Sequence, residues 1–123
     1  MPTLLIPILS SQSPPLQTVF EAKNIDKIFL LLVVDQEATR KFDFLTSEIM
    51  SGRRAMAELE KQIKEKGIPA EPVLQWGDTV DQISQFSNLK KISKIYLEKN
   101  STKSFKEFVK QLEKNVKAKI ELI

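Results

Sequence analysis

Short, nearly continuous apolar runs alternate along this chain with segments whose apolar residues recur at helical spacing, and this alternation restricts the possible folds. Residues 3–9 (TLLIPIL) and 27–34 (KIFLLLVV) are typical of strands buried on both faces, as in a parallel sheet. Further strands are expected at residues 71–75, 92–97 and 118–123. Because a helical segment separates each pair of strands, we expect an α/β fold with three α/β/α layers and a five-stranded parallel sheet.

One residue opposes part of this interpretation. Pro7 lies inside the first apolar run and has no N–H to donate to a neighbouring strand. Prolines within sheets are found mainly on edge strands and at bulges. Pro7 therefore argues against a regular, central first strand.

Caps, stop signals and apolar stripes predict the first two helices. Ser13 precedes two prolines and resembles an N-cap, for a short helix that ends near Asn24. The clearest helix ends before Gly67, and Pro69 just beyond it is a further stop signal. The apolar stripe of this helix is Leu45, Ile49, Gly52, Met56, Leu59 and Ile63.

Two later helices begin at recognisable caps. Residues 73–86 (VLQWGDTVDQISQF) run from a strand through Gly77, Asp78 and Thr79 into a helix. This turn is too short to cradle a phosphate as a Walker loop does, so Asp78 or Thr79 is interpreted as an N-cap. Ser104 and Glu107 have the spacing of a capping box, which predicts the start of the last helix.

The composition excludes several chemistries. The chain of 123 residues contains no histidine and no cysteine, which removes thiol nucleophiles, imidazole acid–base catalysis and the usual zinc sites. We expect no catalytic residue, no metal and no cofactor. The lack of cysteine suits a reducing cytosol, and the N-terminal apolar run is too short to span a membrane. We therefore expect a cytoplasmic protein without membrane contact, with residues 1–123 forming one domain.

Charge is distributed unevenly along the chain. Residues 1–89 carry 9 basic and 12 acidic side chains, whereas residues 90–123 carry 10 lysines and 4 glutamates. A basic segment of this kind could meet a polyanion. A solvated lysine face is the more common outcome, so nucleic acid is not the expected partner.

In the pattern of its segments the chain resembles the universal stress protein family. The resemblance rests on the first strand with its internal proline (LLIPIL) and on a second strand that ends in VVD, with Asp35 at the usual acidic position. It rests also on the long helix that finishes at Gly67, on the strand that runs into Gly77, and on the helix headed by Ser104 before the last strand. The resemblance covers nearly the whole chain. It implies a Rossmann-like, adenine nucleotide α-hydrolase-like sheet with strand order 3-2-1-4-5.

The chain departs from the ATP-binding members of that family. Those members carry an acidic residue and then Gly-Ser after the first strand, where this chain reads Leu9-Ser10-Ser11. After the fourth strand they carry Gly-x-x-Gly, a spacer and Gly-Ser/Thr, since glycine lets the backbone approach an anion. This chain has no glycine after Gly77, and only Ser104 falls where the Ser/Thr would be. The usual ATP site is therefore expected to be absent.

The strand order also implies where a ligand would bind. In open α/β sheets the crevice lies at the carboxyl ends of the strands, here between the first and the fourth strand. Helix N-termini and a lysine converge there, which makes a weak anion site. The same residues could instead be ordinary caps and turns. The candidate residues are Ser10, Ser11, Ser13, Lys99, Ser101, Thr102 and Ser104.

Two functional hypotheses follow. The first is a non-enzymatic regulatory or stress-response domain that acts through dimerisation or through a protein partner. The second is a small-ligand or nucleotide sensor that uses the crevice, with Trp76 as an aromatic that could stack on a base, seal an interface or simply pack. A homodimer is expected through the C-terminal strand, which no proline or glycine interrupts. The interface residues are Ala118, Lys119, Ile120, Glu121, Leu122 and Ile123.

Overall fold

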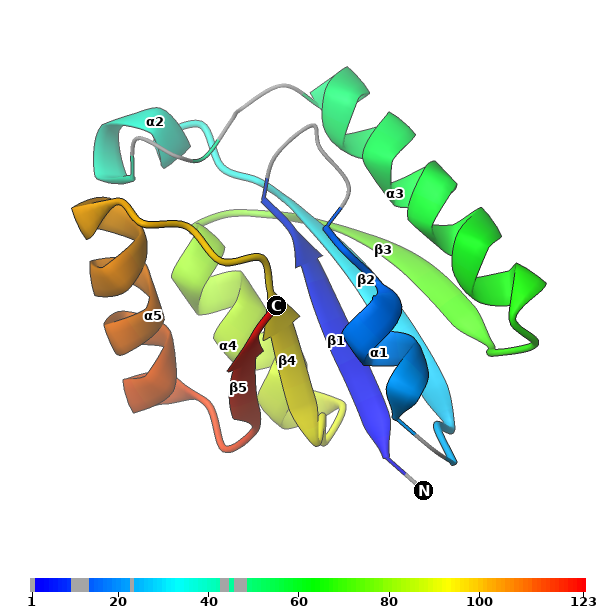
Figure 1. Ribbon diagram of the computed structural model, residues 1–123. Helices are drawn as coiled ribbons and strands as arrows, with labels where there is room; N and C mark the ends of the chain where they lie inside the picture. Colours follow the sequence, from blue (N-terminus) through cyan, green and yellow to red (C-terminus); the bar gives the residue numbers. More distant parts are fainter. Residues whose placement is uncertain (1, 10–13, 23, 43–44, 46–48) are drawn as a thin grey trace.

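The computed structural model describes residues 2–9, 14–22, 24–42, 45 and 49–123. Within these residues, five strands form one all-parallel sheet in the order β3-β2-β1-β4-β5, which confirms the predicted fold class (Figure 1). The strands are β1 (Thr3–Ile8), β2 (Lys27–Val34), β3 (Ala70–Trp76), β4 (Lys94–Leu97) and β5 (Lys119–Leu122). The helices are α1 (Gln17–Glu21), α2 (Ala38–Lys41), α3 (Ile49–Glu65), α4 (Thr79–Leu89) and α5 (Lys103–Asn115).

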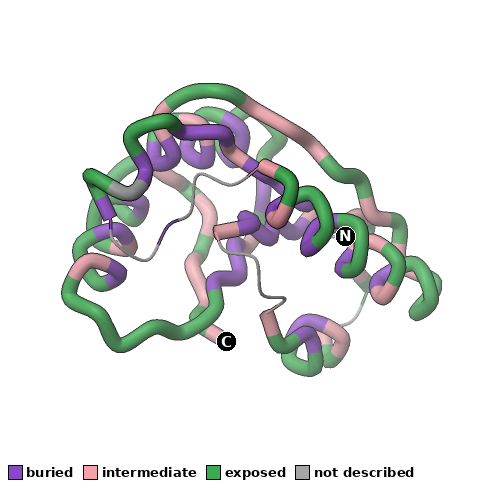
Figure 2. Tube along the Cα trace, turned by 90° about the horizontal axis from the view of Figure 1, so that it is seen from above, coloured by how far each residue is buried: buried purple, intermediate pink, exposed green. Residues whose placement is uncertain are grey.

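The helices cover both faces of the sheet, so the predicted three layers are present. On one face, α1 and α3 pack on the side chains of β1 and β2 that include Leu4, Ile6 and Leu30. On the other face, α2, α4 and α5 pack on those that include Leu5 and Leu31. Figure 2 shows buried residues gathered between the layers and exposed ones along the outer sides of the helices.

The strand that contains Pro7 is central, which corrects the expectation drawn from that residue. β1 pairs with β2 along its whole length, with Pro7 opposite Leu31. Its pairing with β4, however, comprises only Leu4 and Leu5. The ladder to β4 thus ends before Pro7, and the missing N–H interrupts no pairing on that side.

Two helix predictions are also corrected. The long stripe was expected to start with a helical Leu45, but α3 begins at Ile49, and Leu45 is a buried residue outside any helix. The short helix α2, which precedes α3, was not predicted. The first helix, α1, is shorter than predicted. Leu16 occupies its N-cap position, but the side chain of Leu16 makes no capping hydrogen bond. The proposed cap, Ser13, lies outside the described residues.

Further differences concern element ends. The fourth strand begins at Lys94 rather than at residue 92, and Lys91, just after α4, has a positive φ of 53°. The capping box at Ser104 is wrong: the N-cap of α5 is Thr102, whose hydroxyl accepts a hydrogen bond from Phe105 N–H at 3.2 Å. The predicted stop at Gly67 is confirmed by its φ of 77°.

Candidate functional site

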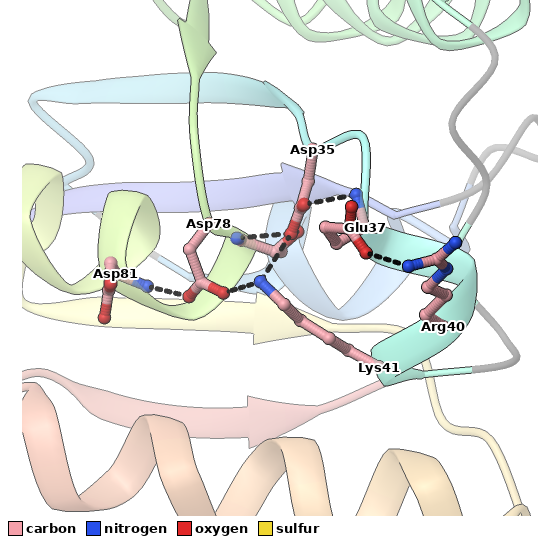
Figure 3. A network of polar contacts seen from close by, with 7 residues as sticks. Asp35, Glu37, Arg40, Lys41, Asp78 and Asp81 are labelled. Carbon is pink, nitrogen blue, oxygen red and sulfur yellow. Dashed lines mark hydrogen bonds and ion pairs between the residues drawn. The ribbon is translucent and has the colours of Figure 1, made fainter.

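Polar side chains follow the strands at the carboxyl edge of the sheet, where parallel α/β sheets bind ligands. Asp35 comes directly after β2, and Asp78 comes two residues after β3. Because Val34 and Trp76 are register partners, these two carboxylates are brought to the same edge from positions 43 residues apart in the chain. Lys41 reaches them from the end of α2 (Figure 3).

Asp35 is the centre of this cluster and is only 5% exposed. One carboxylate oxygen, Oδ1, accepts the Glu37 N–H at 2.9 Å. The other, Oδ2, accepts the N–H and the hydroxyl of Thr79, each at 2.9 Å. The Lys41 ammonium lies 3.6 Å from the same oxygen. Both carboxylate oxygens therefore accept hydrogen bonds from groups of this chain, and the carboxylate links the end of β2 to the first turn of α4.

Two opposed effects set the acidity of Asp35. Burial raises the pKa of its carboxyl group, because the charged form loses hydration. The hydrogen bonds from Thr79 and Glu37 and the positive charge of Lys41 favour the carboxylate and outweigh burial. The pKa consequently lies below the ordinary value of 3.8. A carboxylate held ionised in this way is unsuited to act as a general acid.

The Gly77-Asp78-Thr79 turn is a helix cap, as predicted. Asp78 is the N-cap of α4, and its Oδ2 accepts the Asp81 N–H at 3.0 Å. Its other oxygen accepts a hydrogen bond from the Lys41 ammonium, which raises the pKa of Lys41. The Gly77 N–H donates to the Val34 carbonyl at 3.0 Å. These groups are engaged within the chain and do not point at a phosphate.

Trp76 borders two open hollows at this edge. One hollow of about 410 Å³ lies between the ends of β2 and β3 and the start of α3, and is lined by Val34, Asp35, Gln36, Ile49 and Trp76. The other, of about 300 Å³, extends toward Lys41 and Asp78. Trp76 is 61% exposed, so its ring is open to solvent and does not simply pack.

Only some of the predicted crevice residues lie in the part of the chain that the structure describes. Ser10, Ser11 and Ser13 lie outside the described residues. Lys99, Ser101 and Thr102 are exposed in the connection from β4 to α5. The Thr102 hydroxyl is used as a cap, and its N–H donates to the Asn100 side chain at 2.9 Å. Ser104 lies in the first turn of α5 and is partly buried.

The predicted interface residues lie at the end of the chain, on and beside an edge strand. β5 pairs with β4 on one side only. Ala118 precedes the strand and packs with Ile120 on the α5 side. Glu121 lies 3.7 Å from the Lys94 ammonium, and Leu122 is 39% exposed. Lys119 is exposed, and Ile123 donates its N–H to the Leu97 carbonyl at 2.8 Å.

Sequence reasoning missed the link between Asp35 and Thr79. The available signal was an acidic residue directly after a buried strand, combined with a threonine at a helix start.

No group of three or more acidic side chains suited to a metal occurs in the part of the chain that the structure describes. In that same part, no helix is both long and apolar enough to cross a membrane.

Comparison with known proteins finds matches among solved structures only, since no protein-family model and no curated protein matches the chain. A universal stress protein family protein from Arabidopsis thaliana, solved with AMP bound, superposes with a TM-score of 0.69 at 15% identity, covering 100% of this chain and 91% of that one. A universal stress protein in complex with cAMP gives a TM-score of 0.67 at 14% identity, covering 99% and 95%.

A universal stress protein family protein from Burkholderia pseudomallei gives a TM-score of 0.63 at 15% identity, covering 98% of this chain and 94% of that one. At these identities the likeness concerns the fold. The chain has the universal stress protein fold over nearly its whole length. The resemblance inferred from the sequence is thus confirmed at the level of the fold.

Proposed function

We propose that this protein is a universal stress protein-like regulatory domain that is not an enzyme, does not bind ATP and acts through dimerisation by β5 or through a protein partner. The observation that carries the proposal is the unpaired edge of β5. Unpaired strand edges are templates for pairing with another chain. An antiparallel pair of two β5 strands would be isologous and would extend the sheet across a two-fold axis.

The hydrogen bonds of β5 identify which backbone groups such a pairing would use. Lys119 N–H donates to Ser93, and Ile123 N–H donates to Leu97. The backbone N–H and C=O groups of alternate residues in a strand point to opposite sides within the sheet. Those of Lys119 and Ile123 point to β4, so those of Ile120 and Leu122 point to the open side. These are the groups that a second β5 would meet.

The two edges of the sheet differ in a way that favours β5. The other edge strand, β3, contains Pro72 in its interior. Proline on an edge strand is a common device against edge-to-edge association. β5 has neither proline nor glycine, although Lys119 is a charged residue that opposes association.

Sedimentation equilibrium of the wild-type chain and of Leu122→Pro tests the interface. The substitution removes an outward N–H and leaves the hydrogen bonds between β5 and β4 in place. We expect a wild-type dimer at micromolar concentration and a monomeric Leu122→Pro protein with unchanged far-UV circular dichroism. Leu122→Ala is the matched control and should remain dimeric. A monomeric wild type would overturn the proposal, and a dimeric Leu122→Pro protein would place the interface elsewhere.

The absence of ATP binding is supported by the connection from β4 to α5. It contains no glycine, and α5 begins at Lys103, so few residues are left to wrap a triphosphate. The Thr102 hydroxyl is occupied as a cap. Isothermal titration calorimetry with ATP should show no micromolar binding. A measured micromolar dissociation constant would contradict this part of the proposal.

The lack of enzymatic activity is supported by the state of the polar groups. The sequence offers no histidine or cysteine, and the buried carboxylate of Asp35 is held by four groups of the same chain. A general base needs a free lone pair within reach of its substrate. Asp35 is only 5% exposed and both of its oxygens already accept hydrogen bonds from this chain, which disfavours that role.

The second candidate function is that of a small-ligand or nucleotide sensor. The hollows beside the exposed Trp76 favour it, and two proteins of the same fold were solved with AMP and with cAMP. An aromatic ring can stack on a base. Trp76 is also the sole tryptophan of the chain, so its fluorescence reports on this edge alone.

Titration with AMP and cAMP locates such a site. If a nucleotide binds beside Trp76, the tryptophan emission is quenched and Trp76→Phe weakens binding measured by calorimetry. If it binds at the carboxyl end of β4, near Lys99, Ser101 and Thr102, Lys99→Ala weakens binding and Trp76→Phe does not. No binding of either nucleotide by calorimetry would contradict the sensor function for these ligands.

A further inference from the structure

Four lysines form a stripe along the outer side of α5. Lys103, Lys106, Lys110 and Lys114, here called the lysine stripe, follow each other at intervals of three, four and four residues. At 3.6 residues per turn they lie within an arc of roughly 80° and extend over about 16 Å. All four are exposed, and the buried side of the helix, with Phe105, Phe108 and Leu112, lies opposite.

The lysine stripe forms no ion pair with the residues that the structure describes. Among the described residues, Lys27, Lys41, Lys64 and Lys94 each form an ion pair with a carboxylate. None of the four stripe lysines forms such a pair, although Glu107 and Glu113 lie on the same helix. Their positive charges are therefore available to a partner.

The stability of α5 does not explain why the stripe begins in the first turn. The N-terminal end of a helix is favoured by negative charges and disfavoured by positive ones. The first turn of α5 contains no acidic residue and begins with Lys103. Lys103 is thus placed where the helix dipole disfavours a positive charge, whereas Lys114, in the last turn, lies where the dipole favours one.

The surroundings of the stripe point to one class of partner. Protein interfaces are anchored by apolar or aromatic residues at their centre, and membrane-surface helices insert such residues into the bilayer. On α5 the apolar residues face the sheet, and its exposed residues are the four lysines with Glu107, Gln111, Glu113 and Asn115. A regular row of ammonium groups without an anchor suits a partner that is recognised by charge alone.

We propose that the lysine stripe of α5 binds the phosphate backbone of a nucleic-acid duplex without reading its bases. Lysine is a compact point charge that binds phosphate. A duplex carries one charge per about 1.7 Å, so about nine phosphate charges lie along the length of the stripe. Composition alone favoured a solvated lysine face, but the structure adds that the lysines are aligned and form no ion pair with the described residues. It does not require the dimer.

Fluorescence anisotropy with a labelled DNA duplex of about 20 base pairs, and with the RNA duplex of the same sequence, measures the binding. We expect a logarithmic salt dependence with a slope of up to about −3.6, which corresponds to four neutralised phosphates. The variant Lys106→Glu/Lys110→Glu/Lys114→Glu should bind at least about tenfold more weakly at low salt. Binding of either duplex with this dependence supports the proposal.

The matched control changes the net charge equally on another helix. Arg53, Arg54 and Lys61 are exposed on α3, and Arg53→Glu/Arg54→Glu/Lys61→Glu should bind nearly as tightly as the wild type. Equal weakening by both triple variants would overturn the proposal, since the binding would then follow net charge. So would poly-L-glutamate binding as tightly as the duplexes, which would indicate an acidic protein partner. Circular dichroism verifies that both variants are folded.

Discussion

The carboxylate of Asp35 accepts both the backbone N–H and the hydroxyl of Thr79, each at 2.9 Å. This pair joins the end of β2 to the start of α4 across 44 residues of sequence. Because the carboxylate is buried, its partners cannot be replaced by water without cost. The contact therefore sets the geometry of the carboxyl edge at which Trp76, Asp78 and Lys41 also lie.

Replacing Asp35 by asparagine should destabilise the fold substantially. The Glu37 and Thr79 N–H groups now donate to the two oxygens of one carboxylate, and asparagine would put an N–H₂ group in place of one of these oxygens. We therefore expect the free energy of unfolding to fall by about 2–3 kcal/mol. Thr79→Val removes only the hydroxyl and should cost about 1 kcal/mol. Urea unfolding measures both changes. Asp81→Asn, an exposed first-turn residue of α4, is the control and should cost less than about 1 kcal/mol. Equal effects of Asp35→Asn and Asp81→Asn would contradict the role assigned to Asp35.

The stability that Asp35 contributes should depend on pH. Its pKa in the folded state is lowered, so the contribution is fully present above the pKa of the unfolded chain and is lost as the pH falls through the folded-state pKa. The difference in unfolding free energy between wild type and Asp35→Asn should be constant near neutral pH. It should shrink below an unfolded-state pKa of about 3.9. Urea titrations at several pH values test this, and a difference that grows on acidification would reverse the predicted sign.

The cap of α5 can be tested with two neighbouring residues. Thr102→Ala removes the hydroxyl that accepts the Phe105 N–H, and we expect a loss of about 1 kcal/mol in stability. Ser104→Ala, inside the first turn, should be neutral or slightly stabilising because alanine has the higher helix propensity. Thermal or urea unfolding of the two variants shows which of the two residues caps α5. A larger effect at Ser104 would restore the capping box predicted from the sequence.

Gly52 marks a close approach between α3 and β2. A Cβ atom at this position would lie 2.7 Å from Cδ1 of Leu32, which is buried. Gly52→Leu should therefore force α3 away from the sheet and lower the unfolding free energy by about 1–3 kcal/mol. Ala57→Leu on the exposed side of the same helix is the control, with an expected change within about 0.5 kcal/mol. Chemical denaturation of both variants tests the contact, and an unchanged stability of Gly52→Leu would contradict it.

The layered fold could be predicted because its signals are local. Continuous apolar runs indicate strands buried on both faces, and the helical stripe with Gly67 and Pro69 marks a surface helix and its end. The cap at Asp78 was equally local, since it depends on a side chain and an N–H three residues away. The strand order came from the resemblance to a known family and not from the residues alone.

The tertiary structure decided what distant residues do together. Hydropathy predicts that a segment is buried, but not which of its backbone groups face a given neighbouring strand. Pro7, for example, is tolerated in a central strand because the ladder to β4 ends before it, and the sequence did not show where that ladder ends. Asp35 and Thr79 belong to separate elements, and only strand register brings them into contact. Likewise the sequence determined that the last third is rich in lysine, whereas only the tertiary structure shows that the four lysines on the outer side of α5 form no ion pair with the described residues.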